Sequence, residues 1–162
     1  MRVLRHLFPP SARRLFPADS LERIADAIHQ GEQRHRGEVM FAVEPDLPLQ
    51  AVLRGVQARE RALEAFARLR TWDTEANNGV LIYLLLADHR IEIVADRGLR
   101  GRVSDEQWRG VCQLMEERLR AGEAEAAVIR GINAVSDLLA AFYPQDGSQP
   151  DEDELPNRPH LF

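Results

Sequence analysis

The segment 72–98, WDTEANNGVLIYLLLADHRIEIVADRG, contains the strongest structural signal of this chain. After a polar, turn-rich start it runs through eight apolar residues, 80–87, that carry no charge. Such a run is typical of a strand that is buried on both faces of a sheet. A short polar break then precedes the alternating residues 91–95, which predict a second strand that returns through a hairpin. The segment therefore predicts two neighbouring strands in the centre of an α/β domain.

The flanking sequence supplies the other elements of that domain. Apolar stripes with helical spacing alternate with short apolar runs, and the pair Ser104 and Gln107 has capping-box spacing at the start of a helix. The expected helices cover 19–33, 49–70, 105–120 and 123–142, and the expected strands cover 38–44, 80–87 and 91–95. In helix 49–70, Leu63 is among the side chains expected to face the core.

The order of these elements predicts the topology. A strand, a helix and a second strand in succession require a right-handed parallel crossover, whereas the third strand returns antiparallel. Helices before and after the sheet then cover both of its faces. We therefore expect a three-layer α/β/α sandwich, with a small mixed sheet of three or four strands and four flanking helices.

The two ends differ in composition from the middle of the chain. Residues 1–18 contain four arginines and three prolines, which indicates a basic flexible leader. The alternative is a weak contact with acidic lipid headgroups, although four arginines are few for such a role. Residues 145–162 are acidic and rich in proline, which is typical of disorder. One domain is expected over 19–144, and removal of the tail is expected to leave its stability nearly unchanged.

Composition excludes several classes of function. The formal net charge of −5 argues against non-specific nucleic-acid binding. All 21 basic residues are arginine, so a Schiff-base or P-loop lysine is excluded. The single Cys112 can form neither an intramolecular disulfide nor a cysteine metal cluster. No segment has the roughly 18 apolar residues of a membrane span, and we expect a cytoplasmic protein.

A candidate site follows from the topology. Parallel strands begin at the same edge of a sheet, and an antiparallel neighbour ends there. Four acidic or amide side chains should therefore converge, and oxygen ligands of this kind suit Ca²⁺ or Mg²⁺. The predicted metal ligands are Glu38, Asp73, Asn78 and Asp96. The alternative is ordinary turn chemistry, because Asn-Gly and Asp-x-Gly are frequent in turns.

Three further residues near this edge could contact a phosphate group. Arg36 and Arg97 carry the charge for it, and Asn77 could add a hydrogen bond. His35 lies close enough to the predicted site to move a proton.

Several motifs give the chain a resemblance to a known family. They are Gly37-Glu38, the run NGVLIY over 78–83, Asp96-x-Gly98, Trp108, and Phe-Tyr-Pro over 142–144. In these motifs the chain resembles the TPM-domain family of thylakoid-lumen and photosystem II repair proteins, and in particular its soluble bacterial members. The resemblance covers about residues 16–144.

The resemblance implies an α/β/α sandwich, divalent-cation binding beside the sheet, and the acid phosphatase activity of plant members. Asn77 stands where these bacterial members often have arginine, which removes one candidate phosphate contact. Two functions therefore remain open. One is a cation-binding interaction or assembly module, whose partner could be membrane-associated, and the other is a weak metal-assisted acid phosphatase.

Overall fold

The computed structural model of the chain describes residues 1–145 and 155–162. The helices in this part are α1 (Arg2–Leu7), α2 (Ala12–Leu15), α3 (Ala18–Glu32), α4 (Leu49–Leu53), α5 (Ala58–Arg68), α6 (Asp105–Arg120) and α7 (Ala124–Phe142), with a 3₁₀ turn, η1, at Arg97–Leu99. The strands are β1 (Glu38–Glu44), β2 (Gly79–Leu85), β3 (Arg90–Ala95) and β4 (His160–Leu161).

The four strands form one mixed sheet in the order β3-β2-β1-β4. β1 runs parallel to β2 with Glu38 opposite Gly79, and β3 runs antiparallel to β2 with Ala95 opposite Val80. This is the parallel crossover followed by a hairpin that the sequence predicts.

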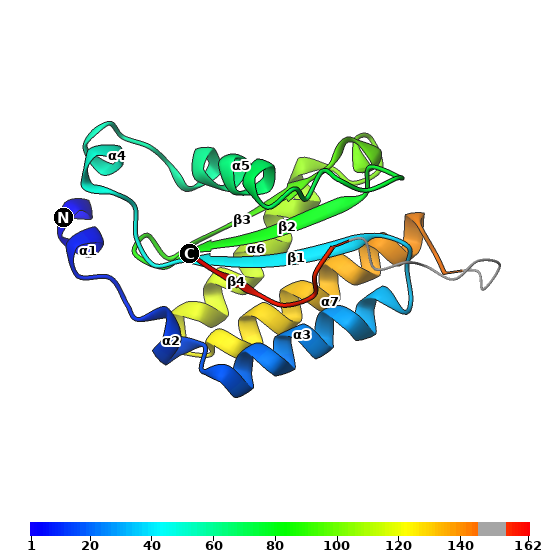
Figure 1. Cartoon of the computed structure of the whole chain (residues 1–162), viewed down its shortest axis with the longest axis horizontal. Coiled ribbons are helices and arrows are strands. Elements are labelled where there is room, and N and C mark those ends of the chain that lie inside the picture. Colours follow the sequence, from blue (N-terminus) through cyan, green and yellow to red (C-terminus); the bar gives the residue numbers. More distant parts are fainter. Residues whose placement is uncertain (146–154) are drawn as a thin grey trace.

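Helices cover both faces of the sheet, so the predicted three-layer sandwich is confirmed. The long helices α3, α6 and α7 pack on one face, and α4 and α5 pack on the other (Figure 1). β2 lies between the two layers. Val80, Ile82 and Leu84 belong to the core on the side of α3, and the side chains between them belong to the core on the side of α5. All seven residues of β2 are buried, as its uninterrupted apolar run predicts.

One predicted helix is two helices. Residues 49–70 form α4 and α5, which are separated by a turn in which Gly55 has a φ of 77°. α5 faces the sheet with Ala58, Ala62 and Ala65. Leu63 lies outside this small-residue stripe and is 49% exposed, so its predicted place in the core is wrong.

The ends of the chain differ from the expected leader and tail. Residues 1–18 contain α1 and α2, and Phe16 is buried against Phe41 with ring centroids 5.8 Å apart. In the tail, β4 pairs with β1, and Leu155 is buried among residues on the α5 side of the sheet. A few apolar residues at the end of an acidic segment thus suffice to add an edge strand. Residues 146–154 of the expected disordered tail lie outside the described residues.

The described helices include none that is both long and apolar enough to cross a membrane.

Candidate functional site

The starts of β1 and β2 and the end of β3 lie at one edge of the sheet. The backbone N–H of Glu38 donates to the carbonyl of Asn78 at 3.4 Å, and the N–H of Asp96 donates to the carbonyl of Gly79 at 2.9 Å. Gly79 is also the register partner of Glu38, so it lies between the two carboxylic residues in the sheet.

The turn over residues 71–78 covers this edge, and two glycines allow its close approach. A Cβ atom on Gly79 would collide with the carbonyl oxygen of Thr71. A Cβ atom on Gly98 would collide with the carbonyl oxygen of Asn77 and would lie 2.6 Å from that of Ala76. The glycines of the Asn-Gly and Asp-x-Gly motifs thus bring backbone carbonyl oxygens next to the strand ends.

Asp96 has the most informative side chain of this edge. Its Oδ1 atom accepts a hydrogen bond from the backbone N–H of Arg97 at 2.8 Å and caps η1. Its Oδ2 atom is buried and has no hydrogen-bond partner among the described residues. A buried carboxylate oxygen needs a hydrogen-bond donor or a cation, because its desolvation is otherwise costly.

Glu38 lies on the same face of the sheet as Asp96. Side chains alternate along a strand, and Met40 and Val94 both belong to the core on the α5 side. Glu38 is two positions before Met40, and Asp96 is two positions after Val94, so both carboxylates are directed towards that side. Glu38 is 1% exposed. The two carboxylates therefore flank Gly79, which has no side chain to separate them.

Asn78 is held on the other face of the sheet. Its backbone N–H donates to Thr74 Oγ1 at 3.1 Å, and its side-chain Nδ2 donates to the carbonyl of Arg36 at 3.0 Å. Its Oδ1 atom is buried and has no hydrogen-bond partner among the described residues. The alternation places this oxygen with Val80, on the side of α3 and α7.

The remaining predicted residues are at the surface or act through their backbones. Asp73 is exposed and pairs with Arg70 at 2.8 Å. The side chains of Arg97 and Asn77 meet at 3.2 Å, which places these two predicted phosphate contacts together. The backbone N–H of Arg36 donates to the carbonyl of Tyr143 at 2.8 Å.

Of the four predicted ligands, the structure therefore brings together only Glu38 and Asp96, whereas Asn78 lies on the other face and Asp73 at the surface. Within the described ranges, no three His, Cys, Asp or Glu side chains are grouped so that they could hold a metal ion. A cation at this edge would depend on Asp96 and Glu38 together with backbone carbonyl oxygens and water, which is a ligand set that Ca²⁺ accepts.

Two residues that support the edge were not predicted as part of the site. Thr74 accepts the hydrogen bond from Asn78, and the hydroxyl of Tyr143 donates to the carbonyl of Gly98 at 2.6 Å. Tyr143 lies in the Phe-Tyr-Pro motif over 142–144, and Thr74 lies in the polar start of the segment 72–98, so these two positions were the available signal.

His35 is fully buried behind this edge. Burial, with a further contribution from the charge of Arg34, lowers its pKa to about 4. Its Nδ1 atom accepts a hydrogen bond from the N–H of Gly37 at 3.1 Å. His35 is therefore neutral at neutral pH and has a structural contact with the start of β1.

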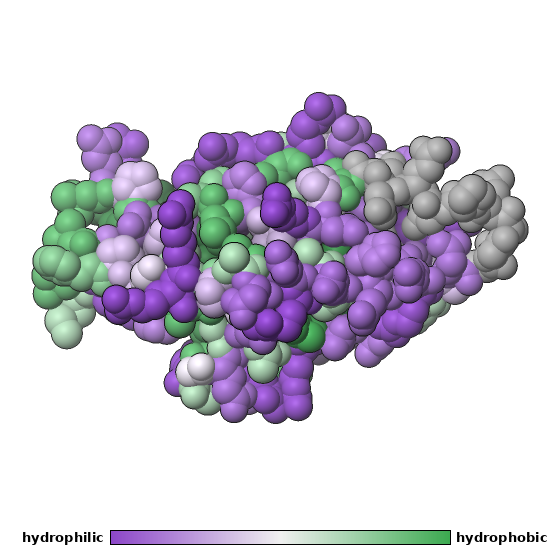
Figure 2. Space-filling view, turned by 60° about the horizontal axis from the view of Figure 1, so that its bottom comes forward, coloured by the Kyte–Doolittle hydropathy of each residue, from purple (hydrophilic) through white to green (hydrophobic). Residues whose placement is uncertain are grey.

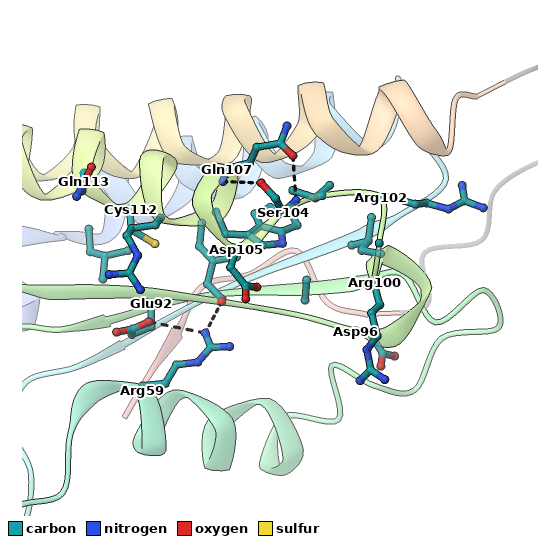
Figure 3. Close-up of a pocket in the computed structure, with 18 of the residues that line it drawn as sticks. Arg59, Glu92, Asp96, Arg100, Arg102, Ser104, Asp105, Gln107, Cys112 and Gln113 are labelled. Carbon is teal, nitrogen blue, oxygen red and sulfur yellow. Dashed lines mark hydrogen bonds and ion pairs between the residues drawn. The ribbon is translucent and has the colours of Figure 1, made fainter.

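A groove of about 840 Å³ extends from Asp96 along the outer edge of β3 to α6. Figure 3 shows Asp96 and Arg100 at one end of it and Arg59 with Glu92 at the other. Its arginines are Arg59, Arg90, Arg97, Arg100, Arg102 and Arg109. Its four carboxylates are Glu92, Asp96, Asp105 and Glu116. The arginines outnumber the carboxylates, so the groove is suited to an anionic group.

Side chains satisfy the outer backbone groups of β3 within this groove. The N–H of Ile91 donates to Glu116 at 3.1 Å, and the carbonyl of Ile93 accepts from Arg59 at 2.6 Å. These contacts protect an edge strand against pairing with another chain. Burial raises the pKa of Cys112, at the floor of the groove, to about 12, so its thiol is protonated.

The TPM domain model matches residues 12–138, which include the whole sheet edge described above. The chain belongs to the TPM-domain family. No curated protein is similar enough in sequence to match.

The solved structures that are similar to this TPM protein include the following two. The BA42 protein of the psychrophilic bacterium Bizionia argentinensis superposes with a TM-score of 0.79 at 26% identity, covering 94% of this chain and 99% of that one. The N-terminal domain of a P. gingivalis protein superposes with a TM-score of 0.64 at 19% identity, covering 82% and 81% of the two chains. The second similarity concerns the fold alone.

Proposed function

We propose that this TPM protein binds one divalent cation, Ca²⁺ or Mg²⁺, at the sheet edge and acts as an interaction or assembly module rather than as an efficient enzyme. The observation that carries the proposal is Asp96 Oδ2, a buried carboxylate oxygen with no hydrogen-bond donor among the described residues. A bound cation would balance its charge and replace the missing hydrogen bond.

The ligands proposed for the cation are not equally well supported by the structure. Asp96 is the principal ligand, and Glu38 supplies the second carboxylate from across Gly79. Carbonyl oxygens of the 71–78 turn complete the set, because the two glycines bring them against the strand ends. Asp73 could contribute only after it leaves Arg70, and Asn78 only by a change of face.

A module of this kind suits the site better than a catalyst does. A metal-assisted hydrolase needs a group that positions or deprotonates a water molecule. His35 is enclosed behind the edge, and the protonated Cys112 thiol is a poor nucleophile. Cation binding would instead fix the 71–78 turn against the strand ends, which would present the turn and the adjoining groove to a partner, including one at a membrane.

The experiment is a calcium titration of thermal stability. A cation that binds only the folded protein stabilises it by mass action and so raises its Tm. At a cation concentration 100 times the Kd, the free energy of unfolding increases by about 2.7 kcal/mol. For a domain of this size we expect the Tm to rise by roughly 2–4 °C for each kcal/mol of stabilisation. Asp96→Asn should abolish the increase, whereas the matched control Asp137→Asn, in an exposed pair with Arg34, should retain it. An unchanged increase in Asp96→Asn would exclude Asp96 as the ligand.

One observation favours weak phosphatase activity as a second candidate. Arg97 and Arg100 line the groove beside Asp96, so a phosphate group that contacts the cation would have guanidinium groups within its reach. Hydrolysis of p-nitrophenyl phosphate should then require Mg²⁺ or Ca²⁺, stop with EDTA, and fall in both Asp96→Asn and Arg97→Gln. Activity that is unchanged in Asp96→Asn would exclude this mechanism.

A further inference from the structure

The orientation of α1 is the reverse of that of an ordinary surface helix. Its buried side contains Arg2 and His6, which lie one helical turn apart, and the partly buried Val3, which packs against the core on the α5 side. His6 is 5% exposed. Its outward side contains Leu4 and Leu7, which are 55% and 51% exposed, and Phe8 follows at 80%. Surface helices usually bury the apolar side, because exposed apolar area is unfavourable in water.

Polar contacts hold α1 in this orientation. The guanidinium of Arg2 donates to both carboxylate oxygens of Asp88 and to the carbonyl of Val56 at 2.6 Å. His6 contacts Asp88 Oδ1 at 3.1 Å and accepts a hydrogen bond from the N–H of Leu47 at 2.9 Å. Partial burial opposes the charge of Asp88, but these hydrogen bonds lower its pKa below the ordinary value.

The exposed side chains of α1 join those of α4 at one end of the molecule. The two helices contact each other, and Figure 2 shows hydrophobic residues gathered at this end. Six of the nine large hydrophobic side chains that the described residues expose belong to it. We call this surface the apolar end, and its members are Met1, Leu4, Leu7, Phe8, Leu49 and Leu53.

The exposed charges on the two helices of the apolar end are positive. α1 and residues 49–54 contain Arg2, Arg5 and Arg54 and no acidic residue, and Asp88 on the hairpin pairs with Arg2. Arg5 and Arg54 are exposed, and neither forms a salt bridge with another described residue. Exposed leucine and phenylalanine beside unpaired arginines are typical of protein surfaces that bind anionic bilayers.

We propose that the apolar end is a preformed surface that binds the interface of an anionic lipid membrane. Leu4, Phe8 and Leu53 enter the boundary between headgroups and acyl chains, while the surrounding arginines contact lipid phosphates. The Arg2–Asp88 pair keeps the apolar side outward, so the helix needs no folding on binding. This surface is separate from the sheet edge with Asp96, and its binding does not depend on the cation proposed above.

The test is sedimentation of the full chain with vesicles, in EDTA and at about 0.1 M NaCl, where surface charges are screened beyond about 10 Å. We expect binding to vesicles of equal parts phosphatidylglycerol and phosphatidylcholine, and little binding to phosphatidylcholine alone. The triple variant Leu4→Ser, Phe8→Ser, Leu53→Ser should lower the partition coefficient by about tenfold or more. The pair Arg5→Gln, Arg54→Gln should lower it by about tenfold as well.

Matched controls separate this surface from exposed apolar residues in general. Leu63 and Leu114 are 49% and 41% exposed on α5 and α6, and Leu63→Ser, Leu114→Ser should bind vesicles as the wild type does. Because the changed residues of the triple variant are exposed, its Tm should stay close to that of the wild type.

Three outcomes would overturn the proposal. The first is wild-type protein that does not bind anionic vesicles in EDTA, and the second is a triple variant that binds as well as the wild type. The third is a wild-type dimer that the triple variant loses in sedimentation equilibrium, without vesicle binding, which would assign the apolar end to a second copy of the chain. Vesicle binding that appears only with Ca²⁺ would overturn the proposal as well, because the wild type would then fail to bind in EDTA.

Discussion

The Nη2 atom of Arg2 lies 2.8 Å from Asp88 Oδ2, although 86 positions separate the two residues in the sequence. This pair joins the first helix to the turn between β2 and β3, the two strands on which the fold depends. The side chains are 25% and 10% exposed, so the pair is only partly screened by water.

Asp88→Ala should release α1 from the hairpin. It removes the partner of a partly buried guanidinium and the contact with His6, at a cost of roughly 1–3 kcal/mol in the free energy of unfolding. Hydrogen exchange should increase in residues 2–7 more than in the sheet. The control Asp19→Ala removes a pair with Arg23 in which the side chains are 67% and 52% exposed, and should leave the midpoint of denaturation nearly unchanged. Equal effects of the two variants would show that Asp88 does not hold α1.

Stability should fall in acid through His35. Its folded-state pKa is about 4, below the value of about 6.5 in the unfolded chain, so the folded state resists the proton that the unfolded state binds. The contribution of the neutral histidine to the free energy of unfolding is therefore complete above about pH 6.5. It decreases as the pH falls from there towards 4. The whole contribution, which is lost once the pH is well below 4, amounts to about 3 kcal/mol in the free energy of unfolding.

Urea denaturation of wild type and His35→Gln at several pH values measures this contribution. The wild type should lose more stability than His35→Gln between about pH 6.5 and 4, because only it gains the proton. His29→Gln, which changes an exposed histidine, should follow the wild type. Parallel pH profiles for wild type and His35→Gln would contradict the assignment.

The end of the chain should matter for stability. Leu155 is 7% exposed, β4 pairs with β1, and the N–H of Phe162 donates to the carbonyl of Val43 at 2.9 Å. Deletion of residues 155–162 should therefore lower the Tm by several degrees, because it removes a buried leucine and exposes the edge of β1. Arg158→Ala, an exposed site in the same segment, should leave the Tm unchanged. The opposite expectation, drawn from the acidic composition, overlooks these few apolar residues.

Leu84→Ala tests the centre of the sandwich. Leu84 is fully buried in β2, and truncation of such a leucine costs about 2–5 kcal/mol. Leu114→Ala, on the exposed side of α6, is the matched control and should cost less than about 1 kcal/mol. An unchanged midpoint of denaturation for Leu84→Ala would be incompatible with a central β2.

The fold could be predicted because its strongest signals are local. The apolar run of β2 and the helical stripes of α3, α6 and α7 depend on neighbouring residues, and the capping box of Ser104 and Gln107 is present as predicted. The break at Gly55 was missed, since a single glycine interrupts a helical pattern without changing its apolar spacing.

The candidate site could be predicted only to the level of the backbone. Strand directions brought Glu38, Gly79 and Asp96 to one edge, as the topology requires. The faces and pairings of individual side chains depend on tertiary contacts, such as Asp73 with Arg70 and Asn78 with the carbonyl of Arg36. The inward orientation of the polar side of α1 could not be predicted either, because its partner Asp88 lies far along the chain.

An NMR titration with Ca²⁺ tests the cation site most directly, because it locates the ion without requiring activity. We expect the amide signals of residues 77–79 and 96–98 to shift together and saturate, while those of Asp88 and His89 at the opposite end of the hairpin stay in place. Asp96→Asn should remove these shifts. Shifts confined to residues 44–46 and 88 would place the ion at the wrong end of the sheet, and no shift at millimolar Ca²⁺ or Mg²⁺ would reduce the cluster to turn chemistry.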